Sequence, residues 1–281
     1  DLDDARSLIN IDADVTLNKN LSVAASGNNS IAEIELNGST TFNSADVFTI
    51  TASGASSDAD LYIANASGDV NTISVTASSS DATAEVNIDA GNIAINTDLN
   101  VTTSNNAALA SFEASADVTL GGNVTITAGA DNSEAEVTLD GSTTFNNAGT
   151  FTVTASGDTS DADLDIANLA TSTVNTLEAL ASGSAASAEI NIAAGDQSGD
   201  ITINTLLSAQ ASGDNSADAT ITFSSDTAVT LTTGADLDVI ASGENSTAEI
   251  ELNGSTTFNS ADVFTITASG ASSDADLYIA N

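Results

Sequence analysis

The sequence predicts an all-β protein, a three-sided parallel β-solenoid (β-helix) of about ten coils of ~26 residues each. Three observations predict this fold. Residues 32–65 recur letter for letter as residues 248–281, and a diverged copy occupies residues 135–168. A shorter motif, an alternating strand ending in Ala-Ser-Gly or a variant, returns roughly every 25–30 residues. Proline is absent, as expected where each strand must donate backbone N–H groups to the next coil.

Each coil contributes three short strands, and their alternation places Val, Ile, Leu, Phe and Ala inside and Thr, Ser, Asn, Asp and Glu outside. First strands such as FTITA begin near residues 21, 48, 73, 99, 124, 151, 177, 207, 237 and 264. Second strands such as AEIEL or ADLYI begin near residues 32, 59, 84, 108, 135, 162, 188, 217, 248 and 275, and SLINI at Ser7 reads as one more. Third strands, which vary more, begin near residues 39, 93, 118, 142, 201 and 255.

The coils group into long repeats of four. These cover residues 32–134 and 135–247, a third begins as residues 248–281, and residues 1–31 read as the end of a preceding repeat. We therefore expect residues 1–281 to form one continuous solenoid, a rod of about 50 Å at the usual strand spacing. An array of immunoglobulin-like sandwiches with repeats of ~100 residues explains the long period but not the short one. Because neither end reads as a polar cap, we expect the protein to be longer or to join end to end.

The composition excludes several classes of function. The chain has 40 acidic and two basic residues, for a formal charge of −38. Such an anion is a poor partner for nucleic acid or an anionic membrane surface, and no run reaches the length that membrane insertion needs. His and Cys are absent, which removes Ser–His and Cys–His chemistry. Every acidic pair repeats along the rod, whereas an active site is unique, so we expect no enzyme.

A column of acidic side chains is the candidate metal site. The outward position after the Ala of the second strand is acidic in all predicted coils except the one with Leu109, and stacked carboxylates about 5 Å apart repel one another. Carboxylate oxygens are the ligands that Ca²⁺ prefers, so we expect calcium between coils; the alternative is a solvated acidic face screened by Na⁺ or Mg²⁺. Adjacent Ser-Asp-Ala-Asp sequences add a second acid per corner. The candidate ligands are Glu33, Asp58, Asp60, Glu85, Glu136, Asp161, Asp163, Glu189, Asp218, Glu249, Asp274 and Asp276.

A second array lies on the first strands, where outward Ser, Thr and Asn pairs follow one another in adjacent coils. The pairs are Thr49/Thr51, Ser74/Thr76, Asn100/Thr102, Thr125/Thr127 and Thr152/Thr154, and the array breaks at Glu178, Ser208/Gln210 and Asp238/Ile240. A flat ladder of Thr-x-Thr strands resembles the ice-binding face of some antifreeze proteins. Because Thr also favours strands in general, the same ladder is explained by the fold alone.

The repeat style, the acidic Ser/Thr/Asn/Asp-rich composition and the absent Cys resemble the stalks of long repetitive bacterial or archaeal surface proteins. Filamentous-haemagglutinin-like β-helical adhesins and biofilm fibres are the nearest comparison. The resemblance implies an extracellular or cell-surface structural module that associates with itself, end to end or laterally, and contacts glycans or a cell surface. The alternative function is a ligand-binding solenoid, with an ice-binding Thr face or a glycan-binding adhesin surface.

Overall fold

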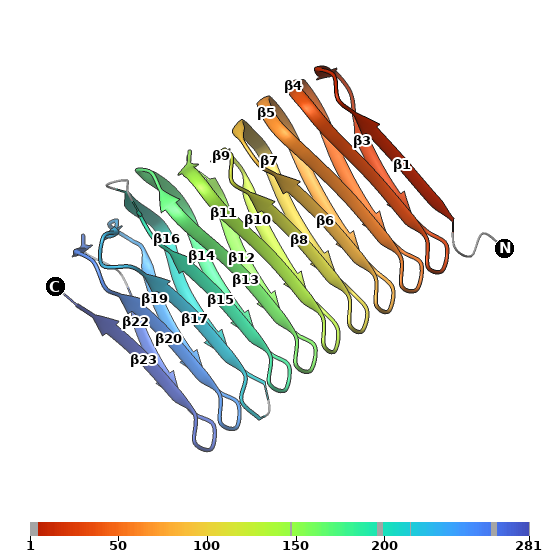
Figure 1. Cartoon of the computed structure of the whole chain (residues 1–281). Coiled ribbons are helices and arrows are strands. Elements are labelled where there is room, and N and C mark those ends of the chain that lie inside the picture. The colour runs from red at the N-terminus through yellow and green to blue at the C-terminus, as the bar shows by residue number, and fades with distance from the viewer. Residues whose placement is uncertain (1–4, 147, 196–198, 214, 260–262, 281) are drawn as a thin grey trace.

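The computed structural model describes residues 5–146, 148–195, 199–213, 215–259 and 263–280, with the side chains of 44–46 and 148 left out. The described residues form a parallel β-solenoid of about ten coils spaced by about 26 residues, as predicted. The stack of coils is continuous from β1 to β23 (Figure 1). Of the predicted single solenoid 1–281, residues 1–4 and 281 lie outside the described residues. The part of the chain that the structure describes contains no helix long and apolar enough to cross a membrane.

The strands line three sides of the rod. Second strands form what we call the acidic face: β1 (Arg6–Ile11), the starts of β4 (Ile31–Ala52) and β5 (Asp58–Ala77), β6 (Thr83–Ile88), β8 (Leu109–Ala114), the starts of β11 (Glu134–Phe145) and β13 (Asp161–Leu169), β15 (Ser187–Ile192), β17 (Asp218–Phe223), β20 (Thr247–Leu252) and β23 (Asp274–Ile279). SLINI, within β1, is therefore a second strand as predicted.

First strands form the hydroxyl face: β3 (Leu21–Ala25), the ends of β4, β5, β7 (Gly91–Thr103), β14 (Ser172–Ala181) and β16 (Asp200–Ala211), together with β10 (Asn123–Ala128), β12 (Ala148–Ala155), β19 (Asp236–Ala241) and β22 (Phe264–Ala268). Third strands form the short face: β2 (Val15–Leu17), β9 (Asp117–Leu120), β18 (Ala228–Leu231), β21 (Thr256–Phe258), the middles of β4 and β5, the starts of β7, β14 and β16, and the ends of β11 and β13.

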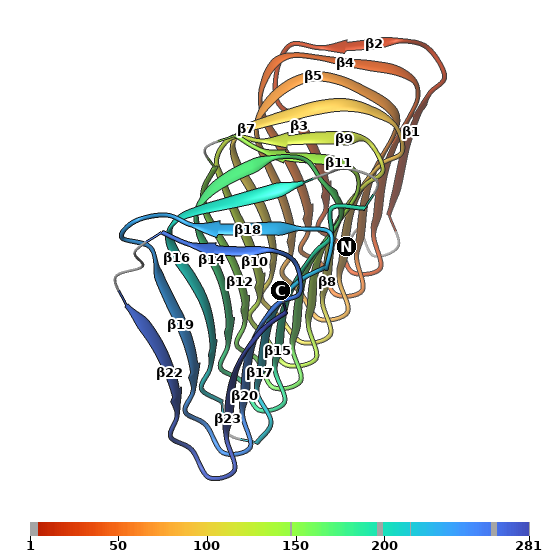
Figure 2. The same cartoon turned by 90° about the vertical axis from the view of Figure 1, so that its left-hand side faces the viewer.

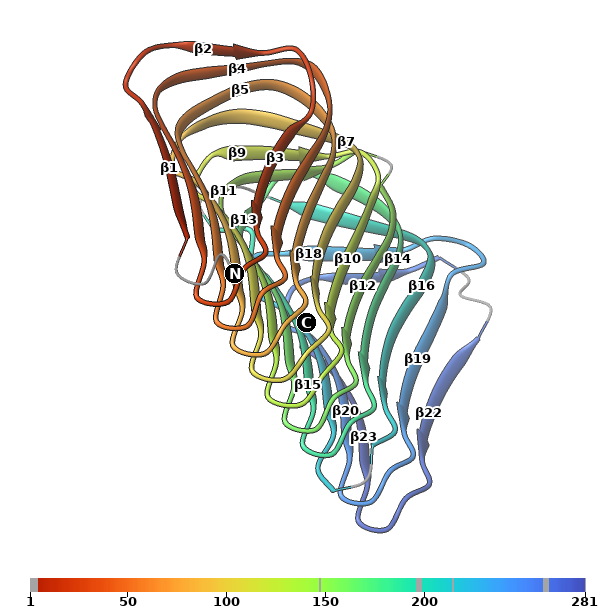
Figure 3. The ribbon, with the colours of Figure 1, turned by 90° about the vertical axis from the view of Figure 1, so that its right-hand side faces the viewer.

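The cross-section of the rod is a narrow triangle. The two views along the stack show the short face at the top, with the acidic and hydroxyl faces converging on a tight corner below (Figures 2 and 3). Each strand pairs in parallel with the equivalent strand one coil away, and the register keeps inward residues over inward residues, as in Ile50 over Val75 and Leu61 over Val86. The alternation that the sequence predicts is therefore the alternation that the fold uses.

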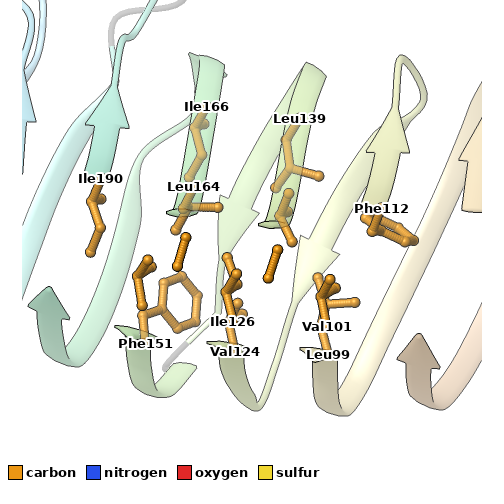
Figure 4. Packing of buried hydrophobic residues seen from close by; sticks show 14 of the residues in the cluster. Leu99, Val101, Phe112, Val124, Ile126, Leu139, Phe151, Leu164, Ile166 and Ile190 are labelled. Atoms are coloured by element: carbon orange, nitrogen blue, oxygen red, sulfur yellow. The ribbon is translucent and has the colours of Figure 1, made fainter. Parts of the chain in front are cut away.

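A single apolar core runs along the inside of the stack. In Figure 4, Leu164 and Ile166 of the acidic face point toward Val124, Ile126 and Phe151 of the hydroxyl face. The rings of Phe42 and Phe48, of Phe145 and Phe151, and of Phe258 and Phe264 meet edge to face with centroids 4.8, 4.5 and 5.1 Å apart. Such pairs are the favoured geometry for aromatic rings. They fill the angle between the short and hydroxyl faces at regular intervals along the rod.

The tight corner explains the Ala-Ser-Gly motif. Gly54 packs against the coil before it so closely that a Cβ there would lie 2.1 Å from the Gly27 carbonyl oxygen. Two residues after this glycine position, most loops hold a non-glycine residue with positive φ, such as Ser56 at 52°. Its N–H donates to a carbonyl of the next coil, for Ser56 that of Ser80 at 3.0 Å. The backbone ladder thus continues through the corner, which offsets the strain of the left-handed residue.

Candidate functional site

The acidic face presents three outward columns because every second residue of its strands points away from the core. Eight of the candidate ligands occupy the central column: Glu33, Asp60, Glu85, Glu136, Asp163, Glu189, Glu249 and Asp276. Four more, Asp58, Asp161, Asp218 and Asp274, occupy the column nearer the tight corner. The structure therefore places all twelve on one face but divides them between two columns.

Two predicted positions in the column are wrong. The register pairs Glu85 with Ser111 rather than with Leu109, and it pairs Glu189 with Thr220 rather than with Asp218. Leu109 and Asp218 each lie two residues earlier, in the column nearer the tight corner. A shift of two residues keeps inside and outside unchanged, so the hydrophobic pattern alone does not detect it.

The corrected register shows a pattern that the sequence reading missed. Reading along the rod from Glu33, the central column has three acids and then Ser111, three acids and then Thr220, and then two acids. A hydroxyl therefore interrupts the carboxylates once in each long repeat of four coils. Because neighbouring like charges repel, this neutral residue limits the longest run of adjacent carboxylates to three.

The middle acid of each run of three is the most perturbed group on this face. Burial raises the pKa of Asp60 to about 7, with help from the charges of Asp58, Glu85 and Glu33. Burial likewise raises the pKa of Asp163 to about 8, helped by Asp161, Glu189, Asp165 and Glu136. In both cases the carboxyl stands between two others, one from each adjacent coil, and its own strand adds a further acid. Desolvation and repulsion therefore act together on it.

Positive charge is scarce around these columns. The chain has only two basic residues, Arg6 and Lys19. A guanidinium nitrogen of Arg6 lies 3.4 Å from a carboxylate oxygen of Glu33, and the Arg6 side chain is 64% exposed. An exposed pair of this kind contributes little to stability. The remaining acids of the central column depend on solvent, on neighbouring hydroxyls and amides, and on protons or dissolved ions.

The structure gives no direct support for a metal centre. Among the residues that it describes, no group of three or more His, Cys, Asp or Glu side chains is arranged to hold a metal ion. Calcium binding by the predicted residues accordingly stays a prediction from the sequence.

A cavity of about 360 Å³ lies where Ser111 interrupts the central column. Four carboxylates line it, those of Glu85, Glu113, Glu134 and Glu136, next to Ser111. Burial and neighbouring charges raise the pKa of Glu85 and of Glu134. Sequence reasoning missed Glu113 and Glu134 because they do not follow the repeated Ala of the second strand. Glu113 lies two residues after Ser111 and Glu134 lies two residues before Glu136, both in the central column, and this spacing is the signal that could have identified them.

The hydroxyl face confirms the predicted ladder of Thr, Ser and Asn. Thr49, Ser74, Asn100, Thr125 and Thr152 stack in register, as do their partners two residues later. The ladder continues with Glu178, Ser208 and Asp238, and Gln210 donates to the Ser208 Oγ at 2.9 Å. The hydroxyl array therefore covers the first half of the rod and changes character in the second.

Comparison of the chain with protein-family models, with curated proteins and with solved structures found no match. What the chain does must therefore be argued from its own architecture and surface.

Proposed function

We propose that the chain is a structural module of an extracellular or cell-surface filament or adhesin stalk. The observation that carries this proposal is the unbroken parallel ladder from β1 to β23 over one core. Each coil is hydrogen-bonded to its neighbours on all three faces and through the tight corner. Such a body resists bending and stretching along its length, which is the property a stalk requires.

The exact sequence repeat supports growth along the rod axis. Residues 66–88 stack in a defined register on residues 40–63, which lie within the repeated segment 32–65. Residues 248–281 have the sequence of residues 32–65. A segment with the sequence of residues 66–88, in the same chain or in another copy, is therefore matched to stack on residues 248–281 in the same way. Self-association or tandem extension is the partner interaction that we propose.

The repetitive surface supports a structural role in a fibre rather than a catalytic role. Its charges and hydroxyls recur from coil to coil, and the strong negative charge of −38 keeps neighbouring rods apart unless dissolved cations screen or link them. The extracellular location rests on the resemblance of the repeat pattern to surface stalks and is part of the proposal.

Electron microscopy and surface labelling test this function together. We expect negatively stained samples of the purified chain to contain straight rods about 20–25 Å wide, in end-to-end or lateral assemblies, and antibodies against the chain to label intact source cells. Antibody against a cytoplasmic protein serves as the control for cell integrity. Isolated particles at all concentrations, with label only after permeabilisation, would contradict the proposal.

The in-register Thr ladder favours one second candidate, binding of ice or of a glycan by the hydroxyl face. Thr125 and Thr127 lie within this ladder, between Asn100/Thr102 of one coil and Thr152/Thr154 of the next. The test is ice-crystal shaping by the soluble chain and binding to a panel of glycans. A variant with Thr127→Lys should abolish either activity while a matched Thr230→Lys change on the short face should not. Absence of both activities in the wild-type chain rejects this candidate.

A further inference from the structure

Charge is distributed unevenly among the faces of the rod. The central outward column of the acidic face carries eight carboxylates. On the hydroxyl face, the two central outward columns begin at Ser22 and Ala24 of β3 and reach Thr152 and Thr154 of β12. Over these six coils, all within the described part of the chain at these positions, both columns consist of Ala, Ser, Thr and Asn and contain no charged side chain. We call these two columns the neutral patch.

The hydroxyl groups of the neutral patch are available to a partner. The side chains of Thr102, Thr125 and Thr127 are partly exposed, and no hydroxyl group of the patch forms a hydrogen bond to another of the described residues. On the acidic face, by contrast, the Thr138 hydroxyl donates to a carboxylate oxygen of Glu136 at 2.9 Å. A hydroxyl both donates and accepts hydrogen bonds, whereas a carboxylate only accepts them. The neutral patch can therefore bond to a second surface of the same kind, and the central column of the acidic face cannot.

The neutral patch is large enough for a specific protein interface. Its strands, among them β3, β10 and β12, follow one another along one side of the rod (Figure 3). Six coils at about 4.8 Å, with an outward surface about 20 Å wide, present about 600 Å². Two such surfaces in contact bury about 1,200 Å², which is the lower end of the range for stable complexes. Each Thr also presents a methyl group, so the contact removes apolar surface from water.

We propose that two copies of the chain pack side by side through their neutral patches. This inference rests on the proposed role in a filament and identifies the lateral contact within it. A pair related by a two-fold axis brings the same surface together from both copies, which requires a surface complementary to itself. The neutral patch meets this requirement. The net charge of −38 disfavours contact through the more acidic sides of the rod, so the uncharged columns are where two copies repel each other least.

Sedimentation equilibrium of the purified chain over a range of concentrations tests this contact. We expect reversible association that strengthens as NaCl is added, because salt screens the remaining acidic residues. Thr102→Glu combined with Thr127→Glu places two carboxylates in adjacent coils of the neutral patch. This double variant should raise the dissociation constant by about tenfold or more. The control, Thr119→Glu combined with Thr144→Glu, adds the same charges to adjacent coils of the short face and should leave the constant unchanged.

Thiol labelling covers the case in which the glutamate variant does not fold. The chain has no cysteine, so Thr127→Cys and Thr119→Cys each introduce a single thiol, on the neutral patch and on the short face. We expect the rate at which a maleimide labels the Thr127→Cys chain to fall several-fold as the chain concentration passes through the association range. The rate for Thr119→Cys should stay constant, because the short face lies outside the contact.

Three results would overturn the proposal: a wild-type chain that is monomeric at every concentration, equal weakening by both pairs of glutamates, or equal labelling of both thiols. Binding of ice or of a glycan that the patch glutamates abolish, without any self-association, would assign the patch to that ligand instead. Rods joined only end to end, with both thiols labelled equally, would exclude the lateral contact and leave the filament role intact. Isolated rods, with antibody label only after permeabilisation, would contradict both.

Discussion

Residues 32–65 and 248–281 have the same sequence but different surroundings. Phe48 is 1% exposed and Ile50 is fully buried, because the next coil covers them. Their counterparts Phe264 and Ile266 are 47% and 53% exposed. The described residues of both segments pair with the preceding coil at equivalent positions, at 31–36, 40–42 and 48–52 in one and at 247–252, 256–258 and 264–268 in the other, so the register toward that coil is the same.

What differs between the two segments is the neighbouring coil. Burial in this protein is supplied by the adjacent coil on each side rather than by the folding of a segment on itself. Stability should then be a sum of contributions from each coil and from each interface between coils, as in other solenoids. Identical substitutions in the two segments therefore measure how much an interface contributes.

The largest difference is expected for Phe48→Ala against Phe264→Ala. Removal of the Phe48 ring leaves a cavity beside Phe42 and between two coils, and the loss of stability should be about 3–5 kcal/mol. At Phe264 the ring is already half exposed, so the loss should be about 1 kcal/mol or less. Guanidinium unfolding followed by circular dichroism measures both. Equal losses would show that burial by the next coil is not the source of the stability.

A smaller difference is expected at the tight corner, for Ser57→Val against Ser273→Val. Ser57 is buried and its Oγ accepts the N–H of Gly54 at 3.0 Å, so the extra methyl groups should cost about 1–3 kcal/mol. Ser273 is less buried, and the same change should cost less. Ser57→Ala is the control and should cost less, about 1 kcal/mol from loss of the acceptor for the Gly54 N–H, because Ala82 takes this position in the next coil. Thermal melts of the variants give the comparison, and a strongly destabilising Ser57→Ala change would contradict it.

The smallest effect is expected from divalent cations. Because stacked carboxylates of like charge repel one another along the acidic face, Ca²⁺ and Mg²⁺ at equal millimolar concentration should both raise the melting midpoint, by a few degrees. Screening of the acidic face is sufficient for such a shift. The control is NaCl at matched ionic strength. A shift that is specific to Ca²⁺ and reversed by EDTA would instead support the calcium sites predicted from the sequence.

The sequence was sufficient to predict the fold because every coil repeats the same alternation. The three strands per coil, the inward Phe positions and the second strand at Ser7 follow directly from that pattern. The central column was predicted wrongly at Leu109 and Asp218, where an Ala of the tight corner, Ala108 or Ala217, was taken for the first inward Ala of the strand. Ala108 is the equivalent of Ser57, and alignment on the left-handed loop residue corrects the register.

The burial and the raised pKa values of the acidic side chains could not be predicted from the sequence in the same way. Alternation indicates only that Asp60 and Asp163 point outward. Their Oδ1 atoms are nonetheless buried, and the carboxylates whose charges raise their pKa values include Glu33 and Glu85 in one case and Glu136 and Glu189 in the other, from both adjacent coils. These neighbours are about 25 residues away along the chain, and only the three-dimensional stack brings them together.

The hydrogen-bonded tight corner has a consequence for digestion by proteases. A protease needs a flexible extended segment, which most proteins offer at loop tips. Here the loop tip is itself tied to the next coil, as Ser56 is to Ser80 and Asn132 is to Asp158. Cleavage by trypsin is restricted further, since its two possible sites follow Arg6 and Lys19. Residues 20–281 therefore contain no trypsin cleavage site. A less selective protease can cleave there only after a coil has unfolded locally from its neighbours.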